Sequence, residues 1–289
     1  MFFKELDERT KGELRDYFED RDYAVIAVPK EEPVRVYVIK ADRTVETTRR
    51  IHGLDPYSTI RLGEWLLSAL ILSSLVKHAS PQKVLLKFTS KEEIIVAEAD
   101  GMGRVRGFMS FASQDNEPEN ITVVKELRMG TPYTSIIPVV SRDIKENLLY
   151  YFEQSEQIKT GLDMAVLLNE DGSVKHAGAY MVQTMGGTSP KVEKLLQERI
   201  KSFPSYSSIL SLGRRPEDVV EDILFDMEPR IVGLKEVEYY CPCNEEIAKA
   251  SLSLLSREEM EEILSDGPAE VVCKFCGRIY RFDRGVLSL

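Results

Sequence analysis

The pattern of apolar and polar positions predicts strands over much of the chain before residue 188. The segment Val34–Ile39 alternates with a period of two residues, as a half-buried strand does, and Tyr23–Val28 is a second β-like run. The turn-forming residues of Pro29–Pro33 lie between these runs, so the two predict a β-hairpin. Similar runs predict further strands at 83–88, 94–99, 104–111, 122–127, 135–140, 162–169 and 177–184.

A helical spacing begins after Asp55, which can cap a first turn that Pro56 suits. Apolar residues in Leu62–Val76 cover most of the circumference of this helix, so we expect it to be buried on several sides. A narrower apolar stripe predicts an amphipathic helix over 144–156. Together these patterns predict an α+β fold, with an α/β core that is rich in antiparallel hairpins.

The character of the chain changes to short helices after Gly186–Pro190. The spacing predicts helices at 192–203 and 218–224, and Ser205–Ser208 and Gly213 interrupt the pattern between them. Isolated helices of this length are marginal in water. We therefore expect them to dock on a neighbouring part of the protein.

The last segment predicts a small module. A short strand at 237–240 precedes a helix that Asn244 can cap, and Ser256–Glu259 form a capping box that opens a second helix. Residues 270–272 and 278–282 predict a hairpin. A module of roughly fifty residues with few core positions is unstable alone, so we expect a bound metal to stabilise its fold. The chain thus divides into an N-terminal extension at 1–22 that is compatible with a charged surface helix, a core at 23–188, a helical linker at 189–235 and a C-terminal module at 236–289.

The four cysteines of the chain all lie in this module, as Cys241, Cys243, Cys273 and Cys276. Structural zinc sites commonly use four cysteine ligands, and Gly277 can take the left-handed conformation that turns backbone N–H groups towards the sulfurs. The single residue inside the first pair is unusual, because it brings two thiols close enough to favour a disulfide as well. The spacing leaves a structural zinc clip, permanent disulfides and a redox-sensing zinc site open.

Composition narrows the class of protein. Hydrophobic residues make up 43% of the chain, enough for a core, and the net charge of −10 disfavours binding to nucleic acid or to an anionic membrane surface. The apolar stretch Leu66–Val76 is too short to span a membrane, and the first residues lack the features of a signal peptide. We expect a cytoplasmic protein, whose clustered, reduced cysteines favour metal binding or redox sensing.

The two cysteine pairs, Cys-x-Cys and Cys-x-x-Cys at this long separation, resemble those of the 33 kDa chaperonin family, the redox-regulated heat-shock holdases. The resemblance extends from about residue 23 to the end and includes Arg49–Gly53, Tyr150–Gln157 and Gly178–Met185. Two features differ. Residues 1–22 look like an extension, and the chain stops soon after Phe282, where many relatives carry a further acidic helix.

This resemblance implies an ATP-independent chaperone that binds unfolding client proteins and is not an enzyme. It implies one Zn²⁺ on the four reduced cysteines and, after oxidation, the disulfides Cys241–Cys243 and Cys273–Cys276. Zinc release would unfold the module and a metastable linker, and the active protein would be a homodimer that later releases clients to foldase chaperones. The apolar linker residues that would then bind clients include Leu195, Leu196, Ile200, Phe203, Val219, Ile223 and Leu224.

Other functions have weaker support. His52, His78 and His176 are far apart in the sequence and have no obvious nucleophile beside them. A thiol oxidoreductase needs one reactive thiol, which four metal ligands would not leave. A constitutive zinc ribbon that binds nucleic acid or a protein partner is the main alternative, although the acidic helices and overall charge argue against nucleic acid. Its basic residues would be Lys274, Arg278, Arg281 and Arg284.

Overall fold

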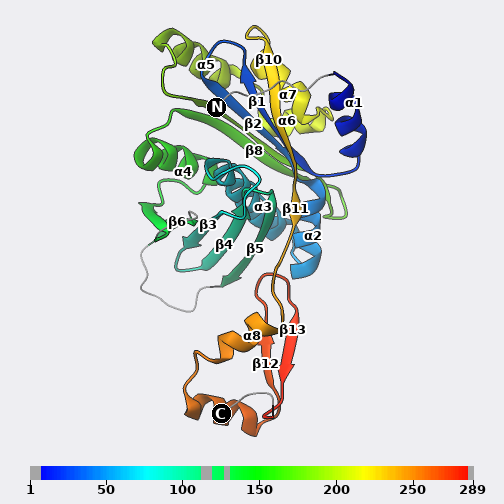
Figure 1. The fold of residues 1–289 in the computed structure, drawn as a ribbon, viewed down its shortest axis with the longest axis vertical. Helices are drawn as coiled ribbons and strands as arrows, with labels where there is room; N and C mark the ends of the chain where they lie inside the picture. Colours follow the sequence, from blue (N-terminus) through cyan, green and yellow to red (C-terminus); the bar gives the residue numbers. More distant parts are fainter. Residues whose placement is uncertain (1–7, 112–118, 127–130, 286–289) are drawn as a thin grey trace. The chain divides into compact units, whose positions relative to one another are not determined.

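The computed structural model describes residues 8–111, 119–126 and 131–285, and the chain forms two compact units. The first unit spans Met1–Tyr239 and the second spans Tyr240–Leu289 (Figure 1). The cysteines therefore belong to a unit of their own, with its own small core.

Two sheets form the frame of the first unit. Their strands are β1 Tyr23–Pro29, β2 Val34–Lys40, β3 Lys83–Thr89, β4 Glu93–Asp100, β5 Arg104–Phe111, β6 Asn120–Glu126, β7 Tyr133–Pro138, β8 Thr160–Leu168, β9 Val174–Thr184, β10 Pro229–Glu236 and β11 Glu238–Tyr239. The five-stranded sheet has the order β10-β1-β2-β9-β8, and the six-stranded sheet has the order β11-β5-β4-β3-β6-β7. Neighbouring strands run antiparallel, except that β11 joins β5 in parallel. The antiparallel α+β fold expected from the sequence is confirmed, and the predicted strand end at residue 127 lies outside the described residues.

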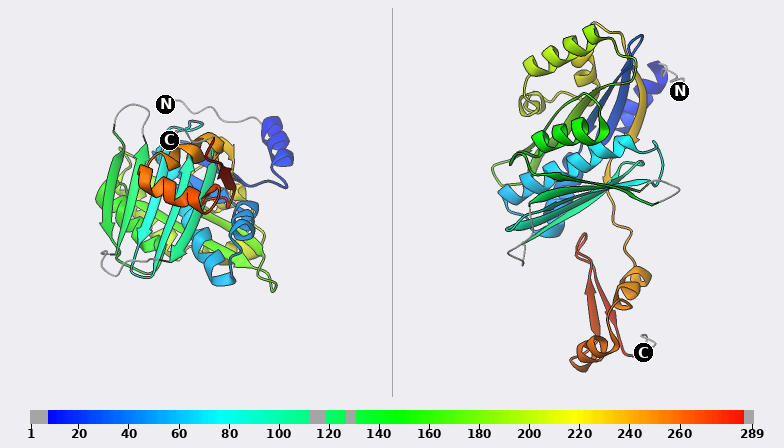
Figure 2. Two further views of the ribbon diagram at one scale, coloured as in Figure 1. Left: turned by 90° about the horizontal axis from the view of Figure 1, so that it is seen from below. Right: turned by 90° about the vertical axis from the view of Figure 1, so that its left-hand side faces the viewer.

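Helices cover both faces of the five-stranded sheet. The helices described in the first unit are α1 Glu8–Tyr17, α2 Asp42–His52, α3 Pro56–Leu72 with a 3₁₀ turn at Ser73–Leu75, α4 Ile144–Tyr151 with a π turn at Phe152–Glu156, α5 Pro190–Ser202, α6 Tyr206–Ser211 and α7 Pro216–Ile223. Helices α2, α3 and α4 lie between the two sheets, and α5, α6 and α7 pack on the opposite face of the five-stranded sheet (Figure 2). The linker helices thus form the outer layer of the first unit.

Helix α3 is the centre of the main core. The Asp55 carboxylate accepts a hydrogen bond from the Ser58 N–H at 2.8 Å, and Pro56 occupies the first turn. Eleven of its 17 residues are buried, because α3 contacts strands of both sheets. The predicted cap and the burial on several sides are both confirmed.

Helix α2 was not predicted from the sequence pattern. Its N-cap residue, Ala41, has no side chain that can accept a hydrogen bond, and its buried residues are Thr44, Val45 and Thr48. The cap comes instead from Asp22, whose carboxylate accepts the Thr44 N–H at 2.7 Å. A helix whose cap lies on another element carries no local start signal.

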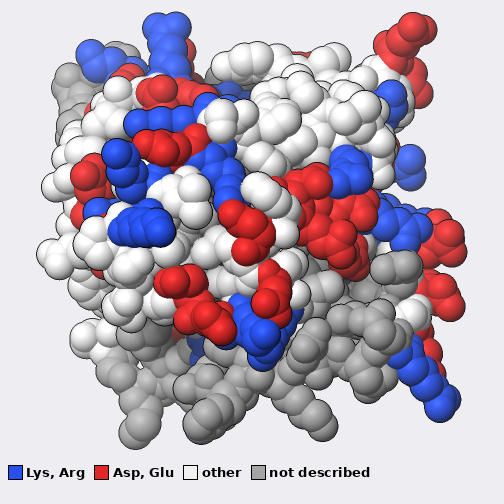
Figure 3. All heavy atoms as spheres, turned by 90° about the horizontal axis from the view of Figure 1, so that it is seen from above, with Lys and Arg blue, Asp and Glu red and all other residues white. Residues whose placement is uncertain are grey.

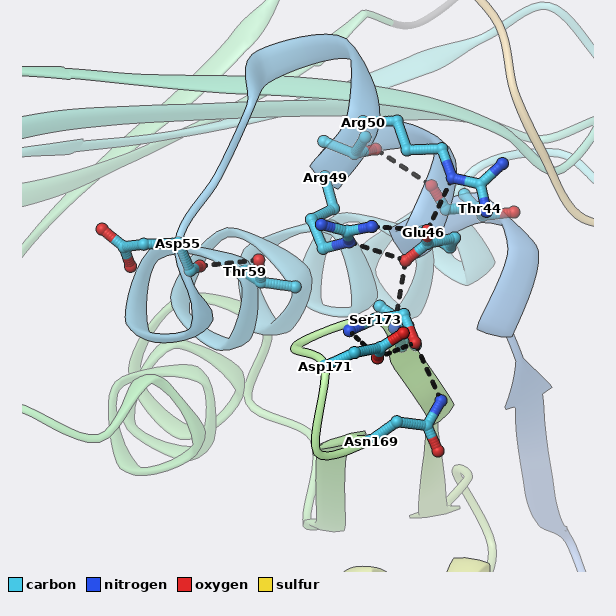
Figure 4. Close-up of polar contacts among 11 residues, drawn as sticks. Thr44, Glu46, Arg49, Arg50, Asp55, Thr59, Asn169, Asp171 and Ser173 are labelled. Atoms are coloured by element: carbon cyan, nitrogen blue, oxygen red, sulfur yellow. Dashed lines mark hydrogen bonds and ion pairs between the residues drawn. The ribbon is translucent and has the colours of Figure 1, made fainter.

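The C-terminal turn of α2 is tied to the β8–β9 hairpin by Glu46 (Figure 4). Its carboxylate accepts hydrogen bonds from Arg49 at 2.8 Å and 2.9 Å, from Arg50 at 2.6 Å and from the Val174 N–H at 3.0 Å. The hydrogen bonds from Arg49 are the main reason that the pKa of Glu46 falls to about 2. Gly53 then ends the helix with φ of 58°. The stretch 49–53, which resembles the family, therefore has a structural role: it ends α2 and holds the Glu46 carboxylate that contacts the β8–β9 hairpin.

Two parts of the linker differ from the sequence prediction. The expectation that Ser205–Ser208 interrupt the helical pattern is wrong, because Ser205 is the N-cap of α6 and the other three residues form its first turn, where the Tyr206 N–H donates to the Asp163 carboxylate at 2.8 Å. The expectation that 189–235 is helical is wrong for its last residues, because Pro229–Glu236 form β10. This strand pairs antiparallel with β1. Tyr23 lies opposite Glu236 at one end of the pairing, and Pro29 lies opposite Pro229 at the other. Pairing with an existing strand outweighs the local helical context.

The N-terminal extension contains α1 and is attached to the core by its last residues. Phe18 is buried and stacks on Tyr23 with ring centroids 4.9 Å apart. The Arg21 guanidinium forms an ion pair with Glu236 at 2.8 Å, and the Tyr17 hydroxyl donates to the same carboxylate at 3.3 Å. The extension is thus anchored to β10, near the end of the first unit, and residues 1–7 lie outside the described residues.

Up to residue 285, where its description ends, the second unit has two helices and one hairpin. Its elements are α8 Glu245–Leu252, α9 Arg257–Ser265, β12 Ala269–Val272 and β13 Ile279–Phe282. Asn244 caps α8 by accepting the Ile247 N–H at 2.8 Å, and Ser256 and Glu259 form the predicted capping box. Among the residues described here, its core cluster consists of Ala248, Leu252, Met260, Ala269 and Phe282.

Candidate metal centre

The hairpin of β12 and β13 positions one pair of thiols. Its register places Val272 opposite Ile279, and the Cys273 N–H donates to the Arg278 carbonyl at 2.9 Å. Gly277 has φ of +70° and its N–H donates to the Cys273 carbonyl at 2.8 Å, which closes a tight turn around Cys276. The predicted left-handed glycine is confirmed, and it turns this part of the chain around the two sulfurs.

The other pair of thiols lies between β11 and α8. Cys241 and Cys243 belong to a segment without regular secondary structure that ends at the Asn244 cap. Helix α8 contacts both β12 and β13, so it holds this segment beside the hairpin. The long gap between the pairs in the sequence is closed by helix packing inside the second unit.

The four sulfurs meet in one cluster. All four Sγ atoms lie within 4.8 Å of one another, with Cys241 3.7 Å from Cys273 and Cys243 3.2 Å from Cys276. A tetrahedral Zn²⁺ with bonds of about 2.3 Å keeps its sulfur ligands about 3.8 Å apart. The cysteines therefore fit a single tetrahedral metal ion. Within the part of the chain that the structure describes, no other group of three His, Cys, Asp or Glu side chains is placed to hold one.

Ionisation of the clustered thiols is favourable only when a cation is bound to them. Burial, followed by the hydrogen bonds of the neighbouring thiols, raises the pKa of Cys276 to about 12. Four thiolates at these distances repel one another, whereas a dication offsets their charge and deprotonates coordinating thiols. Four sulfur donors in this geometry suit zinc or another thiolate-preferring metal.

Two further residues contact the cluster, and the sequence analysis did not assign them this role. The Tyr280 hydroxyl donates to Cys243 Sγ at 3.2 Å. The Arg278 guanidinium donates to the Tyr280 hydroxyl at 3.3 Å and to the Cys243 carbonyl at 3.2 Å. The alternation of inward and outward residues along the final strand is the signal that could have identified Tyr280.

The candidate client-binding residues lie in the first unit and are mostly covered. Leu196, Val219, Ile223 and Leu224 are buried in a core cluster with residues of β1, β2 and β9, and Ile200 and Phe203 pack partly buried against it. Leu195 differs, because 39% of its surface is exposed. An open cleft of about 580 Å³ lies between α5, α4 and the five-stranded sheet, and its lining includes Leu149, Leu162, Leu196 and Ile200. Helix α5 is therefore less closely packed on the sheet than α7.

The other candidate sites are not assembled. His176 lies 3.7 Å from the Asp42 carboxylate, and the three histidines do not meet as a metal-binding group in the described ranges. Of the basic residues near the cysteines, Arg281 pairs with Glu270 at 2.6 Å and Arg278 contacts the Cys243 arm. Contacts of this kind are not typical of a nucleic-acid interface. Figure 3 shows one face of the protein, on which acidic and basic side chains lie next to one another rather than in separate patches.

Comparisons with known proteins agree with this arrangement. Residues 22–283 match the family profile described as Hsp33 protein. The chain is 52% identical to the 33 kDa chaperonin of Aquifex aeolicus, over 100% of this chain and 95% of that protein. It is 30% identical to the 33 kDa chaperonin of Clostridioides difficile, over 91% of this chain and 96% of that protein. The match to the family begins where the N-terminal extension ends.

A solved structure gives the same result for the fold. The crystal structure of the 33 kDa chaperonin from Thermotoga maritima superimposes with a TM-score of 0.79 at 28% identity, covering 92% of this chain and 96% of that chain. None of the helices in the described ranges has the length and apolarity needed to cross a membrane.

Proposed function

The chain belongs to the Hsp33 family of chaperones, and we propose that it is an ATP-independent holdase that oxidation of its cysteines activates. The observation that carries this proposal is the cluster of four thiols within 4.8 Å, in a unit with a very small apolar core. A unit of this kind depends on its metal, and the thiols that hold the metal are the groups that oxidants attack.

We propose that the metal is Zn²⁺, one per chain, held by Cys241, Cys243, Cys273 and Cys276 as thiolates. Zinc would supply a tetrahedral crosslink between the two cysteine arms. Structural zinc contributes about 10–16 kcal/mol in small zinc peptides, whereas whole domains have a net stability of only about 5–15 kcal/mol. Loss of the metal should therefore unfold the second unit.

Oxidation would remove the ligands in pairs. In each pair two thiolates together give two electrons to an oxidant such as hydrogen peroxide and form an S–S bond. The family resemblance implies pairing within each arm, Cys241 with Cys243 and Cys273 with Cys276. The folded site also brings sulfurs of different arms together, with Cys243 and Cys276 3.2 Å apart. Either pairing consumes all four ligands and ends metal binding.

The linker would convert this event into client binding. In the reduced protein most of its apolar residues are covered by the five-stranded sheet, and the open cleft beside α5 means that this helix has less packing to lose. Once these helices leave the sheet, a contiguous apolar surface becomes available. We propose that this surface holds unfolding clients, drives formation of a homodimer and is later vacated when foldase chaperones take over the client. A reducing compartment, the cytoplasm, would keep the resting protein inactive.

The test measures zinc content and free thiols before and after mild peroxide treatment at raised temperature, and follows aggregation of a denatured client in parallel. The proposal expects one zinc per chain to leave as four thiols disappear and aggregation to be suppressed. Samples heated without peroxide separate oxidation from heat. If zinc stays bound and aggregation is unaffected, the cluster is a structural clip, and a constitutive zinc module that binds a partner becomes the better account.

A further inference from the structure

The Cys243 sulfur has a hydrogen-bond partner that is not a cysteine. The Tyr280 hydroxyl donates to it at 3.2 Å, although the two residues are 37 positions apart in the sequence. The Arg278 guanidinium donates to the Tyr280 oxygen at 3.3 Å and to the backbone carbonyl of Cys243 at 3.2 Å. A chain of hydrogen bonds thus runs from the β13 side of the site to one sulfur of the opposite arm.

The strand explains why a tyrosine reaches this sulfur. Alternate residues of a strand share a face, so Tyr280 and Phe282 point the same way from β13. Phe282 is buried in the small core of the second unit, and Tyr280 lies one step closer to the cysteine turn on that side. Ile279 and Arg281 occupy the opposite face and are exposed. The side that packs the core is therefore the side that presents a phenol to the cluster.

We propose that Tyr280 is a positioning residue that shields the Cys243 sulfur and so sets how readily oxidants open the metal centre. An O–H donor on a thiolate engages a lone pair and part of the negative charge that the thiolate would use as a nucleophile. The Arg278 guanidinium withdraws charge from the phenol oxygen, which makes its O–H a stronger donor to sulfur. This inference rests on the proposed function, because it treats oxidation of the cysteines as the physiological event.

The hydrogen bond opposes a two-step oxidation of the thiolates by hydrogen peroxide. A thiolate sulfur attacks one oxygen of hydrogen peroxide, the O–O bond breaks, and a sulfenic acid and hydroxide result. A second thiolate then attacks the sulfenic sulfur, forms the S–S bond and releases another hydroxide. In the first step the Cys243 sulfur must use a lone pair that accepts the hydrogen bond from the Tyr280 hydroxyl. The hydrogen bond therefore has to weaken before the sulfur reacts.

The test uses the reduced, zinc-loaded full chain and limiting N-ethylmaleimide, so that each labelled molecule carries a single label. Mass spectrometry then gives the share of label at each of the four cysteines. Replacing Tyr280→Phe keeps the ring and removes only the hydroxyl. We expect the share at Cys243 to rise roughly tenfold relative to the other three, the size of one hydrogen bond to a charged group. The rate of zinc release by peroxide should rise in parallel.

Controls separate this role from a structural one. The Tyr57→Phe variant changes an exposed tyrosine of the first unit and should leave the labelling profile unchanged. A merely structural loss in Tyr280→Phe would raise labelling of all four cysteines together. If Tyr280→Phe fails to load zinc, Arg278→Ala, which retains the phenol, takes its place and should shift the profile in the same direction by a smaller factor.

An unchanged profile in the variant that loads zinc would overturn the inference. The labelling result does not depend on chaperone activity. If oxidised wild-type protein fails to suppress aggregation, the proposed function falls, while the share of label at Cys243 still decides whether Tyr280 shields that sulfur.

Discussion

Truncation of Ile223 would show whether the linker helices detach before the core unfolds. This side chain is fully buried, on the face of α7 that packs against β1 and β2. The change Ile223→Ala removes three carbon atoms, worth about 0.8 kcal/mol each, and the remaining cavity brings the expected loss to about 3 kcal/mol. A loss of that size increases the undocked fraction of the linker roughly a hundredfold.

The assay follows aggregation of a heat-denatured client in the presence of reduced, zinc-loaded protein, without peroxide. We expect Ile223→Ala to suppress aggregation at temperatures where the wild-type protein still needs oxidation. Metal analysis should show that the variant keeps its zinc, because the cysteines lie in the other unit. Hydrogen exchange should show amides of α7 opening more readily than those of α3.

A matched control is available in the same linker. Leu212→Ala removes a side chain of similar size that is 79% exposed and is not among the candidate client-binding residues, so it should cost less than about 1 kcal/mol and leave the activation temperature unchanged. The reasoning would be refuted if zinc-loaded Ile223→Ala stayed inactive up to its unfolding temperature, with amides of α7 and α3 exchanging together. The linker would then be part of the cooperative core.

Three more predictions concern the metal, pH and the N-terminal extension. Cys276→Ser removes one of the four ligands, so zinc content should fall well below that of the wild type and the second unit should become sensitive to proteases. Burial raises the pKa of Glu64 to about 7, so this carboxyl loses its proton in the unfolded state before it does in the folded state, and the wild type loses stability progressively as pH rises from about 4.5 to 7. Glu64→Gln should therefore increase the unfolding free energy at pH 8 by at most about 3 kcal/mol and leave it unchanged near pH 4.5, as urea titrations at both pH values would show. Phe18→Ala removes the buried ring that stacks on Tyr23 and should cost about 3 kcal/mol in the same titrations, whereas no change would mean that the extension is not part of the folded core.

Local sequence signals predicted the elements that carry their own start and stop residues. The β1–β2 hairpin, the Asp55 cap of α3, the Asn244 cap of α8 and the positive φ of Gly277 are all confirmed. Each depends on residues within a few positions of one another. The short-range hydrogen bonds and backbone preferences that produce these elements can therefore be read directly from the chain.

The elements that were missed depend on distant partners. Helix α2 takes its cap from Asp22. Helix α6 has a local N-cap in Ser205, but its first N–H, that of Tyr206, donates to the Asp163 carboxylate, which is 43 positions away. Strand β10 exists because β1 offers an unpaired edge more than 190 positions earlier, where Tyr23 pairs with Glu236. A helix that is capped by a distant residue shows no capping signal in its own sequence. A strand that forms by pairing with a distant edge shows no periodic pattern of its own.

The sequence by itself determined the chemistry of the candidate site: four thiols, their grouping in two arms, and a tight glycine turn in the second arm. Only the tertiary structure decided how these groups meet. The packing of α8 on the β12–β13 hairpin brings the two arms into one cluster, and the same face of β13 that buries Phe282 aims Tyr280 at Cys243. The reason is physical. Ligand type and turn preference belong to single residues, whereas distances between sulfurs depend on burying apolar side chains from segments far apart in the chain.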